Sequence, residues 1–127
     1  MAEHGTFIWN ELISPDPETS GAFYSALLGW SLRQADMGGS GTYRLFQNGG
    51  HDVAGLMAPP PGAPADTARW HGYIAVEDLD ASLARVPALG GKVLMPATEI
   101  PDVGRICVIA DPVGAVVSLM QPADPAW

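Results

Sequence analysis

Two side chains in apolar stretches of this sequence are of types that transfer protons. Glu11 lies within the run from Phe7 to Ile13, and His71 lies within the run from Trp70 to Val76. Burial disfavours the charged form of a carboxylate, so Glu11 is a candidate general base. His71 is a candidate acid, base or metal ligand, because imidazole changes its charge near neutral pH. The two residues are therefore the candidate catalytic pair.

Structural interpretations of the same residues stay open. Glu11 could pair with Arg105 or Arg69, or form hydrogen bonds between the two halves of the chain. His71 could be a satisfied structural histidine. Tyr73 could orient a substrate oxygen, or pack with its hydroxyl at the rim of a pocket.

Strand alternation gives these residues a common location. Successive side chains of a strand point to opposite faces, and in three predicted strands one set is aliphatic while the other mixes polar and aromatic groups. Such a mixture is typical of a ligand pocket. The mixed sets contain Trp9, Glu11, His71, Tyr73, Ser118 and Met120. We therefore expect Trp9 to form an aromatic wall, with Tyr73, Ser118, Met57 and Met120 as further substrate-binding residues. The alternative for Trp9 is a place in the core, and methionine more commonly fills a core than lines a pocket.

The first half of the chain predicts a strand, a helix and three strands. Asp16 is a helix cap, followed by Pro17 at the first helical position, and Gly29 ends the helix. Asn48-Gly49-Gly50 predicts a hairpin turn, and Gly38 to Gly41 a loop. The expected strands are Phe7 to Ile13, Trp30 to Ala35, Tyr43 to Gln47 and Val53 to Met57.

The second half repeats this order. Asp78 caps a helix whose last turn should be distorted by Pro87, and Gly90-Gly91 closes it. Asp111 to Gly114 predicts a turn with Pro at its second place and Gly at its fourth. The expected strands are Trp70 to Val76, Lys92 to Met95, Arg105 to Ala110 and Ala115 to Met120.

The repeat predicts the fold class. Two half-modules of type βαβββ, at about residues 5–57 and 69–121, flank a proline-rich linker at 58–68. Each half presents one sheet face to its helix and leaves the other to line a cavity. We expect an α+β fold in a single domain over residues 1–127, with the helices outside a curved, partly closed mixed sheet.

Amino-acid composition and net charge favour some classes of binding partner over others. The chain has 127 residues, is 47% hydrophobic and has a formal net charge of −8. The acidic charge disfavours nucleic acid and suits a neutral or cationic ligand, although it also serves solubility. No apolar run is long enough to span a membrane, and the first residues lack the pattern of a signal peptide, so we expect a cytoplasmic protein. The single cysteine, Cys107, is expected to be a buried core residue.

Several short motifs recur in a fixed order and spacing. They are Asp16, Phe23-Tyr24, Leu28-Gly29-Trp30, Val76-Glu77-Asp78-Leu79-Asp80, Leu89-Gly90-Gly91 and Asp111-Pro112-Val113-Gly114. Together they resemble the vicinal-oxygen-chelate superfamily, which includes glyoxalase I, extradiol dioxygenases, methylmalonyl-CoA epimerase and bleomycin-resistance proteins. The motifs Trp9-Asn10-Glu11-Leu12, Gly104-Arg105 and Ala110-Asp111-Pro112 resemble those of small bacterial glyoxalase-like proteins. One-module members of the superfamily commonly pair as homodimers, so the resemblance implies a homodimer.

The resemblance implies four metal-ligand positions, and only one of them carries a good ligand. They fall on Trp9, on the strand at Gly55 to Met57, on His71 and on Ser118. Glu11 lies on the same strand face as Trp9 and would be a displaced ligand beside His71. Stable sites use about three or more protein ligands, so we expect no metal or other cofactor.

Three functions follow as hypotheses. The first is a metal-independent protein that binds a small molecule and uses Glu11 and His71 for acid–base chemistry. The second is a metal-dependent lyase, isomerase or dioxygenase with an altered ligand set at His71 and Glu11. The third is a sequestration protein of the bleomycin-resistance kind, for which the acidic charge suits a cationic drug.

Overall fold

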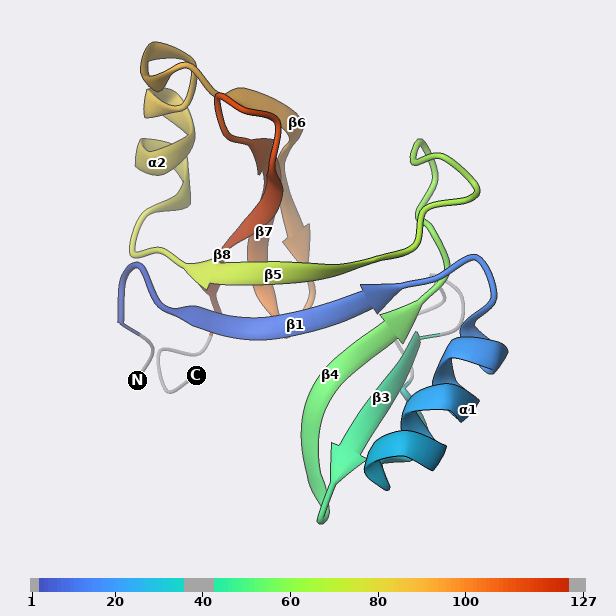
Figure 1. Ribbon diagram of the computed structural model, residues 1–127. Helices are drawn as coiled ribbons and strands as arrows, with labels where there is room; N and C mark the ends of the chain where they lie inside the picture. Colours follow the sequence, from blue (N-terminus) through green and yellow to red (C-terminus); the bar gives the residue numbers. More distant parts are fainter. Residues whose placement is uncertain (1–2, 36–42, 124–127) are drawn as a thin grey trace. The chain divides into compact units, whose positions relative to one another are not determined.

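The computed structural model describes residues 3–35 and 43–123 and has an α+β fold (Figure 1). The order βαβββ occurs twice, as predicted. The elements are β1 (Phe7–Ile13), α1 (Pro17–Leu28), β2 (Ser31–Ala35), β3 (Tyr43–Asn48), β4 (His51–Met57), β5 (Arg69–Ala75), α2 (Leu79–Arg85), the short helix η1 (Pro87–Leu89), β6 (Lys92–Ile100), β7 (Gly104–Ala110) and β8 (Val116–Pro122). Among the described residues, no helix has both the length and the apolar character needed to cross a membrane.

The chain divides into two compact units, which are described separately. Residues 10–71 form the first unit; residues up to Trp9, together with those from Gly72 onward, form the second. In the first unit the strand order is β2-β3-β4-β1, with β1 parallel to β4 and the other pairs antiparallel. Leu12, Phe46, Ala54 and Leu56 form its core, and partly buried aromatic rings of Tyr24, Trp30 and Trp70 pack around Phe46.

Local signals set the ends of α1 and of the hairpin after it. Asp16 accepts a hydrogen bond from the Thr19 backbone N–H, and Gly29 ends the helix in the left-handed conformation. Gly49 and Gly50 both have positive φ and join β3 to β4, with Asn48 opposite His51. These features confirm the predicted cap, helix end and turn.

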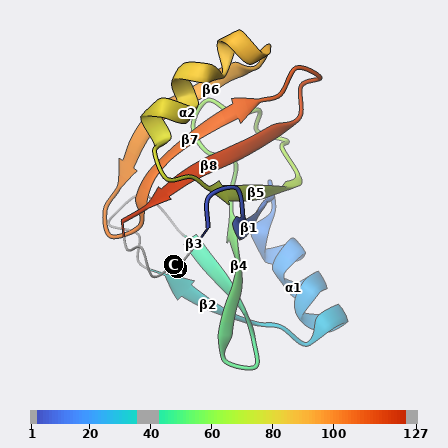
Figure 2. The ribbon, with the colours of Figure 1, turned by 90° about the vertical axis from the view of Figure 1, so that its left-hand side faces the viewer.

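The second unit has the same arrangement. Its strand order is β5-β8-β7-β6, with β5 parallel to β8 and the other pairs antiparallel. Figure 2 shows α2 lying along this sheet. The core consists of Val76, Leu79, Cys107 and Leu119. Burial raises the pKa of the Cys107 thiol, which keeps the reactive thiolate unpopulated and fits the expected core role.

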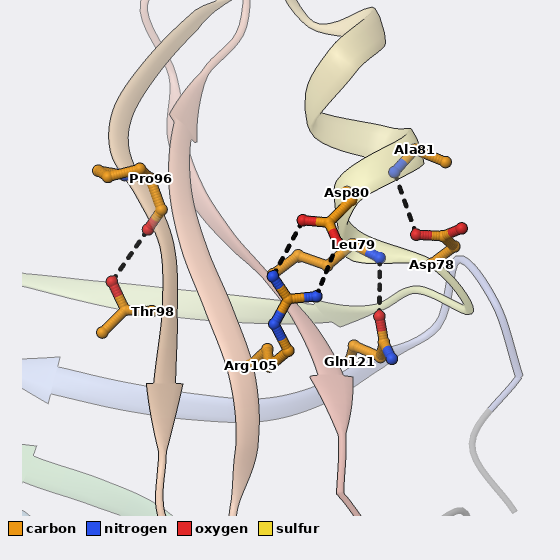
Figure 3. A network of polar contacts seen from close by, with 8 residues as sticks. All are labelled: Asp78, Leu79, Asp80, Ala81, Pro96, Thr98, Arg105 and Gln121. Carbon is orange, nitrogen blue, oxygen red and sulfur yellow. Dashed lines mark hydrogen bonds and ion pairs between the residues drawn. The ribbon is translucent and has the colours of Figure 1, made fainter.

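Hydrogen bonds and an ion pair connect helix α2 to strands β7 and β8 (Figure 3). The Leu79 backbone N–H donates to the Gln121 side chain over 2.9 Å, and Asp78 accepts from the Ala81 N–H. Two guanidinium nitrogens of Arg105 donate to the Asp80 carboxylate over 2.9 and 3.0 Å. The expected distortion at the helix end is confirmed, because the chain continues into η1.

The largest difference from the predicted strand bounds is at the end of β6 in the second unit, and the other bounds differ by at most two residues. β6 runs to Ile100, whereas the prediction ended it at Met95, before Pro96. β6 is the outer strand of this unit, so a residue without an N–H is tolerated there, and the pairing shifts register on either side of Met95. β8 extends to Pro122, two residues beyond the expected end. The loop predicted at Gly38 to Gly41 lies outside the described residues.

Candidate functional site

Candidate polar residues occupy equivalent positions of the paired parallel strands in the two units. In the first unit Glu11 of β1 pairs in register with Gly55 of β4. In the second unit Tyr73 of β5 pairs in register with Ser118 of β8. The repeat therefore places a carboxylate beside a glycine in one unit, and a phenol beside a hydroxyl in the other.

Glu11 is buried and hydrogen-bonded to a residue that the sequence analysis had not selected. Its side chain is only 6% exposed, and the Tyr43 hydroxyl donates to Glu11 Oε2 over 2.8 Å. A buried carboxylate needs such donors, because a charge taken out of water is costly. Tyr43 stands at the start of β3, 32 residues away in the chain.

Gly55 makes room for this contact. A Cβ atom at Gly55 would overlap the hydroxyl and ring of Tyr43. Only a residue without a side chain therefore lets the phenol cross β4 to reach Glu11. The signal that could have found Tyr43 is this glycine inside an otherwise apolar strand.

His71 is buried, with 4% of its surface exposed, and it is paired with its near neighbour Arg69. Arg69 Nη1 lies 2.9 Å from His71 Nδ1. A guanidinium can only donate, so Nδ1 is the acceptor in this bond. Burial, and secondly the Arg69 charge, lowers the pKa of His71 to about 4, so the imidazole is neutral at pH 7.

Met57 of β4 is a further candidate of the first unit. Met57 is half-buried, and its register partner is Ile13; the alternate residues Leu12 and Leu56 point into the core. Met57 therefore shares the face of Glu11 in the first unit.

The second unit carries the other candidates. Ser118 is fully buried and lies between Tyr73 of β5 and Val108 of β7 in register. Met120 is buried opposite Ala75, while Trp9 and Tyr73 are half-buried. The structure thus brings Glu11, His71 and Met57 into one unit, and Trp9, Tyr73, Ser118 and Met120 into the other.

Two surface hollows of about 410 and 430 Å³ contain none of these residues. The hollow in the first unit includes Arg33 and Arg44. Arg33 is bound to Asp52 at 2.9 Å, and Arg44 lies 3.6 Å from Glu18, so the charge of each arginine is already matched. Neither hollow therefore replaces the predicted sheet faces as the candidate site.

Comparison with known families identifies the chain. The glyoxalase-like domain family matches residues 10–120. This chain belongs to the glyoxalase-like family of the vicinal-oxygen-chelate superfamily. The match covers both repeats and confirms the family that the motifs indicated.

Curated relatives of this glyoxalase-like chain are about twice its length. It is 42% identical over 122 residues to proteins named "Putative glyoxylase CFP32" from Mycobacterium tuberculosis and Mycobacterium bovis, which covers 95% of this chain and 46% of theirs. It is 34% identical over 129 residues to the anthracycline biosynthesis protein DnrV of Streptomyces peucetius, covering 92% of this chain and 47% of that protein.

A solved structure supports the same fold. Methylmalonyl-CoA epimerase from Mycobacterium tuberculosis superposes with a TM-score of 0.64 at 21% identity, covering 99% of this chain and 95% of the epimerase. At this identity the likeness shows the vicinal-oxygen-chelate fold, and the activity of this glyoxalase-like chain needs separate evidence.

The residues present do not fit the four-ligand metal site that the superfamily implies. The indole of Trp9 has no lone pair with which to coordinate a metal ion, Gly55 to Met57 offer no carboxylate, and the Nδ1 atom of His71 faces a guanidinium. Within residues 3–35 and 43–123, no group of three or more His, Cys, Asp or Glu side chains is placed to hold a metal ion.

Proposed function

We propose that this glyoxalase-like chain binds a small molecule and moves one of its protons with Glu11 as general base, without a metal ion. The observation that carries the proposal is the buried Glu11 carboxylate, which Tyr43 orients through a 2.8 Å hydrogen bond. A base that is fixed in a sheet and shielded from water is well placed for proton transfer.

The substrate class follows from the chemistry that such a base supports. A carboxylate removes a proton most readily from carbon next to a carbonyl group, because the carbonyl oxygen takes up the charge. The chain is similar to proteins named glyoxylase and methylmalonyl-CoA epimerase, and an epimerase inverts a stereocentre. We infer a carbonyl compound with an acidic C–H bond. Met57 lies on the strand face of Glu11 and is the expected substrate contact within the first unit.

The decisive experiment is turnover of a small panel by the wild type and by Glu11→Gln. The panel contains methylglyoxal with glutathione, and methylmalonyl-CoA. Loss of the base should lower the rate by about 100-fold or more, since general bases contribute about 10²–10⁴-fold. Glu77→Gln is the matched control, because Glu77 is an exposed carboxylate. Turnover that survives in Glu11→Gln would refute the role of Glu11.

Metal content separates this proposal from a metal-dependent lyase, isomerase or dioxygenase. We expect protein purified without chelator to contain less than about 0.2 equivalents of any divalent ion, because stable sites need about three protein ligands. Elemental analysis measures this directly. A stoichiometric ion whose removal abolishes turnover would favour the metal-dependent alternative.

A second candidate function is sequestration of a cationic drug. The net charge of −8 and the similarity to anthracycline biosynthesis proteins favour it. Daunorubicin is a suitable probe because it is a fluorescent, cationic anthracycline. Tight binding without turnover of any panel compound would support sequestration over proton transfer.

We further propose that the chain acts in the cytoplasm as a homodimer. The relatives are about twice as long as this chain, so two copies of the chain together match the length of one relative. Helix α1 offers an apolar surface for the second copy, because Phe23, Leu27 and Leu28 are between 50% and 63% exposed.

A further inference from the structure

The turn between β3 and β4 places an Asn-Gly sequence at an exposed end of the first unit. β3 ends at Asn48, β4 begins at His51, and these two residues are register partners. Gly49 and Gly50 form the turn between them, with φ of 59° and 86°, as a type I′ turn requires. Residues 48–51 are all exposed, so water reaches the Asn48 side chain.

The backbone nitrogen of Gly49 is placed to attack the side-chain amide of Asn48. Attack by this nitrogen closes a five-membered ring, and such intramolecular reactions are strongly favoured when the reacting atoms are held together. Because Asn48 pairs with His51, the Gly49 N–H lies in the turn and outside the ladder. A Cβ at Gly49 would meet no atom of the described residues within 4 Å, and glycine itself has none, so the nitrogen is sterically open.

The strand pairing of Asn48 opposes the reaction, because ring closure requires this residue to leave its paired position. The pair of Asn48 and His51 is the last of the β3–β4 ladder, and a register shift between Phe46 and Gln47 separates the turn from the remaining pairs. Terminal pairs open at a small fraction of the free energy of global unfolding. The turn can therefore reach the reactive conformation while the rest of the sheet stays folded.

We propose that Asn48 is a site of spontaneous deamidation, at which the folded chain converts the side-chain amide into aspartate and isoaspartate. The inference is independent of the proposed function. It assigns a covalent modification to the hairpin whose strands carry Tyr43 and Gly55.

Water is the only co-reactant. The Gly49 nitrogen bonds to the side-chain carbonyl carbon of Asn48, the bond from that carbon to the amide nitrogen breaks, and ammonia leaves with the proton of the Gly49 N–H. Water then adds to one of the two carbonyl carbons of the cyclic imide, and the bond from that carbon to the Gly49 nitrogen breaks. Opening at the side-chain carbon gives aspartate, and opening at the main-chain carbon gives isoaspartate. Neither step involves oxidation or reduction.

Both products change the end of the hairpin. Each adds a carboxylate opposite His51, in a chain whose net charge is already −8. Isoaspartate also lengthens the main chain by one carbon, whereas the geometry of a type I′ turn depends on its length. We therefore expect the pair with His51 to be lost in the isoaspartate product and kept in the aspartate product.

Ageing of the folded protein in H₂¹⁸O at mildly alkaline pH tests the site, with peptide mapping by mass spectrometry. The chain has two asparagines, and Asn10 is the internal control because it is exposed but is followed by Glu11. Label should enter position 48 about tenfold or more faster than position 10, because a side chain on the following residue hinders the attack. Equal rates at the two positions, or no label at Asn48, would overturn the inference.

The same measurement in urea shows whether the fold presents the site. We expect the folded rate to stay within about 100-fold of the unfolded rate, because only the turn has to open. A reaction that needed global unfolding would be slower by about 10³-fold or more. A folded rate below the 100-fold limit would show that the hairpin protects Asn48, which contradicts the proposal.

Two alanine variants separate access to the nitrogen from strain in the turn. Gly49→Ala and Gly50→Ala are matched, because each places a methyl group in open space at a positive φ. Gly49→Ala alone hinders the attacking nitrogen, so it should slow labelling by about tenfold or more, while Gly50→Ala stays within about threefold of the wild type. Equal slowing in both variants would show that turn strain sets the rate and would overturn the role of the Gly49 nitrogen.

Discussion

The Tyr43 side chain occupies the space beside Gly55, where a larger residue would place its Cβ. This packing can be tested without any ligand. A Cβ at position 55 would overlap the phenol that donates to Glu11. We expect Gly55→Ala to lower the free energy of unfolding by about 1–3 kcal/mol, as overpacking does. Urea unfolding followed by tryptophan fluorescence measures it.

The control for this prediction is the same substitution in a Tyr43→Leu background. A leucine is too short to reach the space above Gly55, so the added methyl group should then cost less than about 0.5 kcal/mol. An equal cost in both backgrounds would show that Gly55 serves the strand itself and not the phenol.

His71 predicts a pH dependence of stability. Its folded pKa of about 4 lies below its ordinary value of 6.5, so the unfolded chain binds more protons between these values. Stability is fully present above about pH 6.5 and is lost as the pH falls towards 4. We expect about 1–3 kcal/mol of this loss to disappear in His71→Gln, measured by urea unfolding at several pH values.

The exposed His51 supplies the comparison for that pH series. His51 lies at the start of β4 and is exposed, so His51→Gln should leave the slope between pH 4 and 6.5 unchanged. A slope that is the same in the wild type and in His71→Gln would mean that His71 titrates normally.

Alternation along a single strand predicted on which face a candidate residue lies, and no role in a site follows from that alone. Glu11, His71 and Ser118 were placed on the faces opposite the aliphatic core residues, and the structure shows all three buried. Tyr43 was missed because its contact with Glu11 spans two strands and depends on the gap at Gly55. No local pattern encodes a contact between residues 32 positions apart.

At the scale of elements, the cap of α2 offers a clear prediction. Asp78 accepts from the Ala81 N–H at the start of a seven-residue helix, so the cap is a large share of that helix's end contacts. We expect Asp78→Ala to lower the free energy of unfolding by about 1 kcal/mol. Thermal and urea unfolding should agree on this loss.

A neighbouring carboxylate serves as the matched control for the cap. Glu77 is exposed and precedes the cap, so Glu77→Ala should change the unfolding free energy by less than about 0.5 kcal/mol. A similar loss in both variants would indicate a general charge effect and no specific cap at Asp78.

Element ends were predictable where a single residue determines them. Asp16, Gly29 and the Gly49-Gly50 turn behave as their types require. The end of β6 was predicted five residues too early, at Met95, whereas the strand continues through Pro96 to Ile100. Proline is excluded from central strands but tolerated in an outer one. The order of the strands within the sheet decides this, and that order is a tertiary property which the local sequence does not contain.

At the scale of the whole molecule, the pairing of two chains is the remaining prediction. Two copies would together match the length of the relatives, of which this chain covers 46–47%. Light scattering should therefore give about twice the chain mass of 13.3 kDa. A wild-type mass of one chain would refute the homodimer.

Leu27 tests whether helix α1 forms that contact. It is 63% exposed and stands one helical turn from Phe23, so the two side chains make one apolar surface. A charge buried without a partner destabilises an interface strongly. We expect Leu27→Glu to shift the mass to a single chain, while circular dichroism and the unfolding midpoint measured at low concentration stay close to those of the wild type.

Ala26→Glu is the control, because it places the same charge at an exposed position next to Leu27. Equal dissociation by both variants would indicate charge repulsion alone, and a dimer that persists in Leu27→Glu would place the contact on another surface.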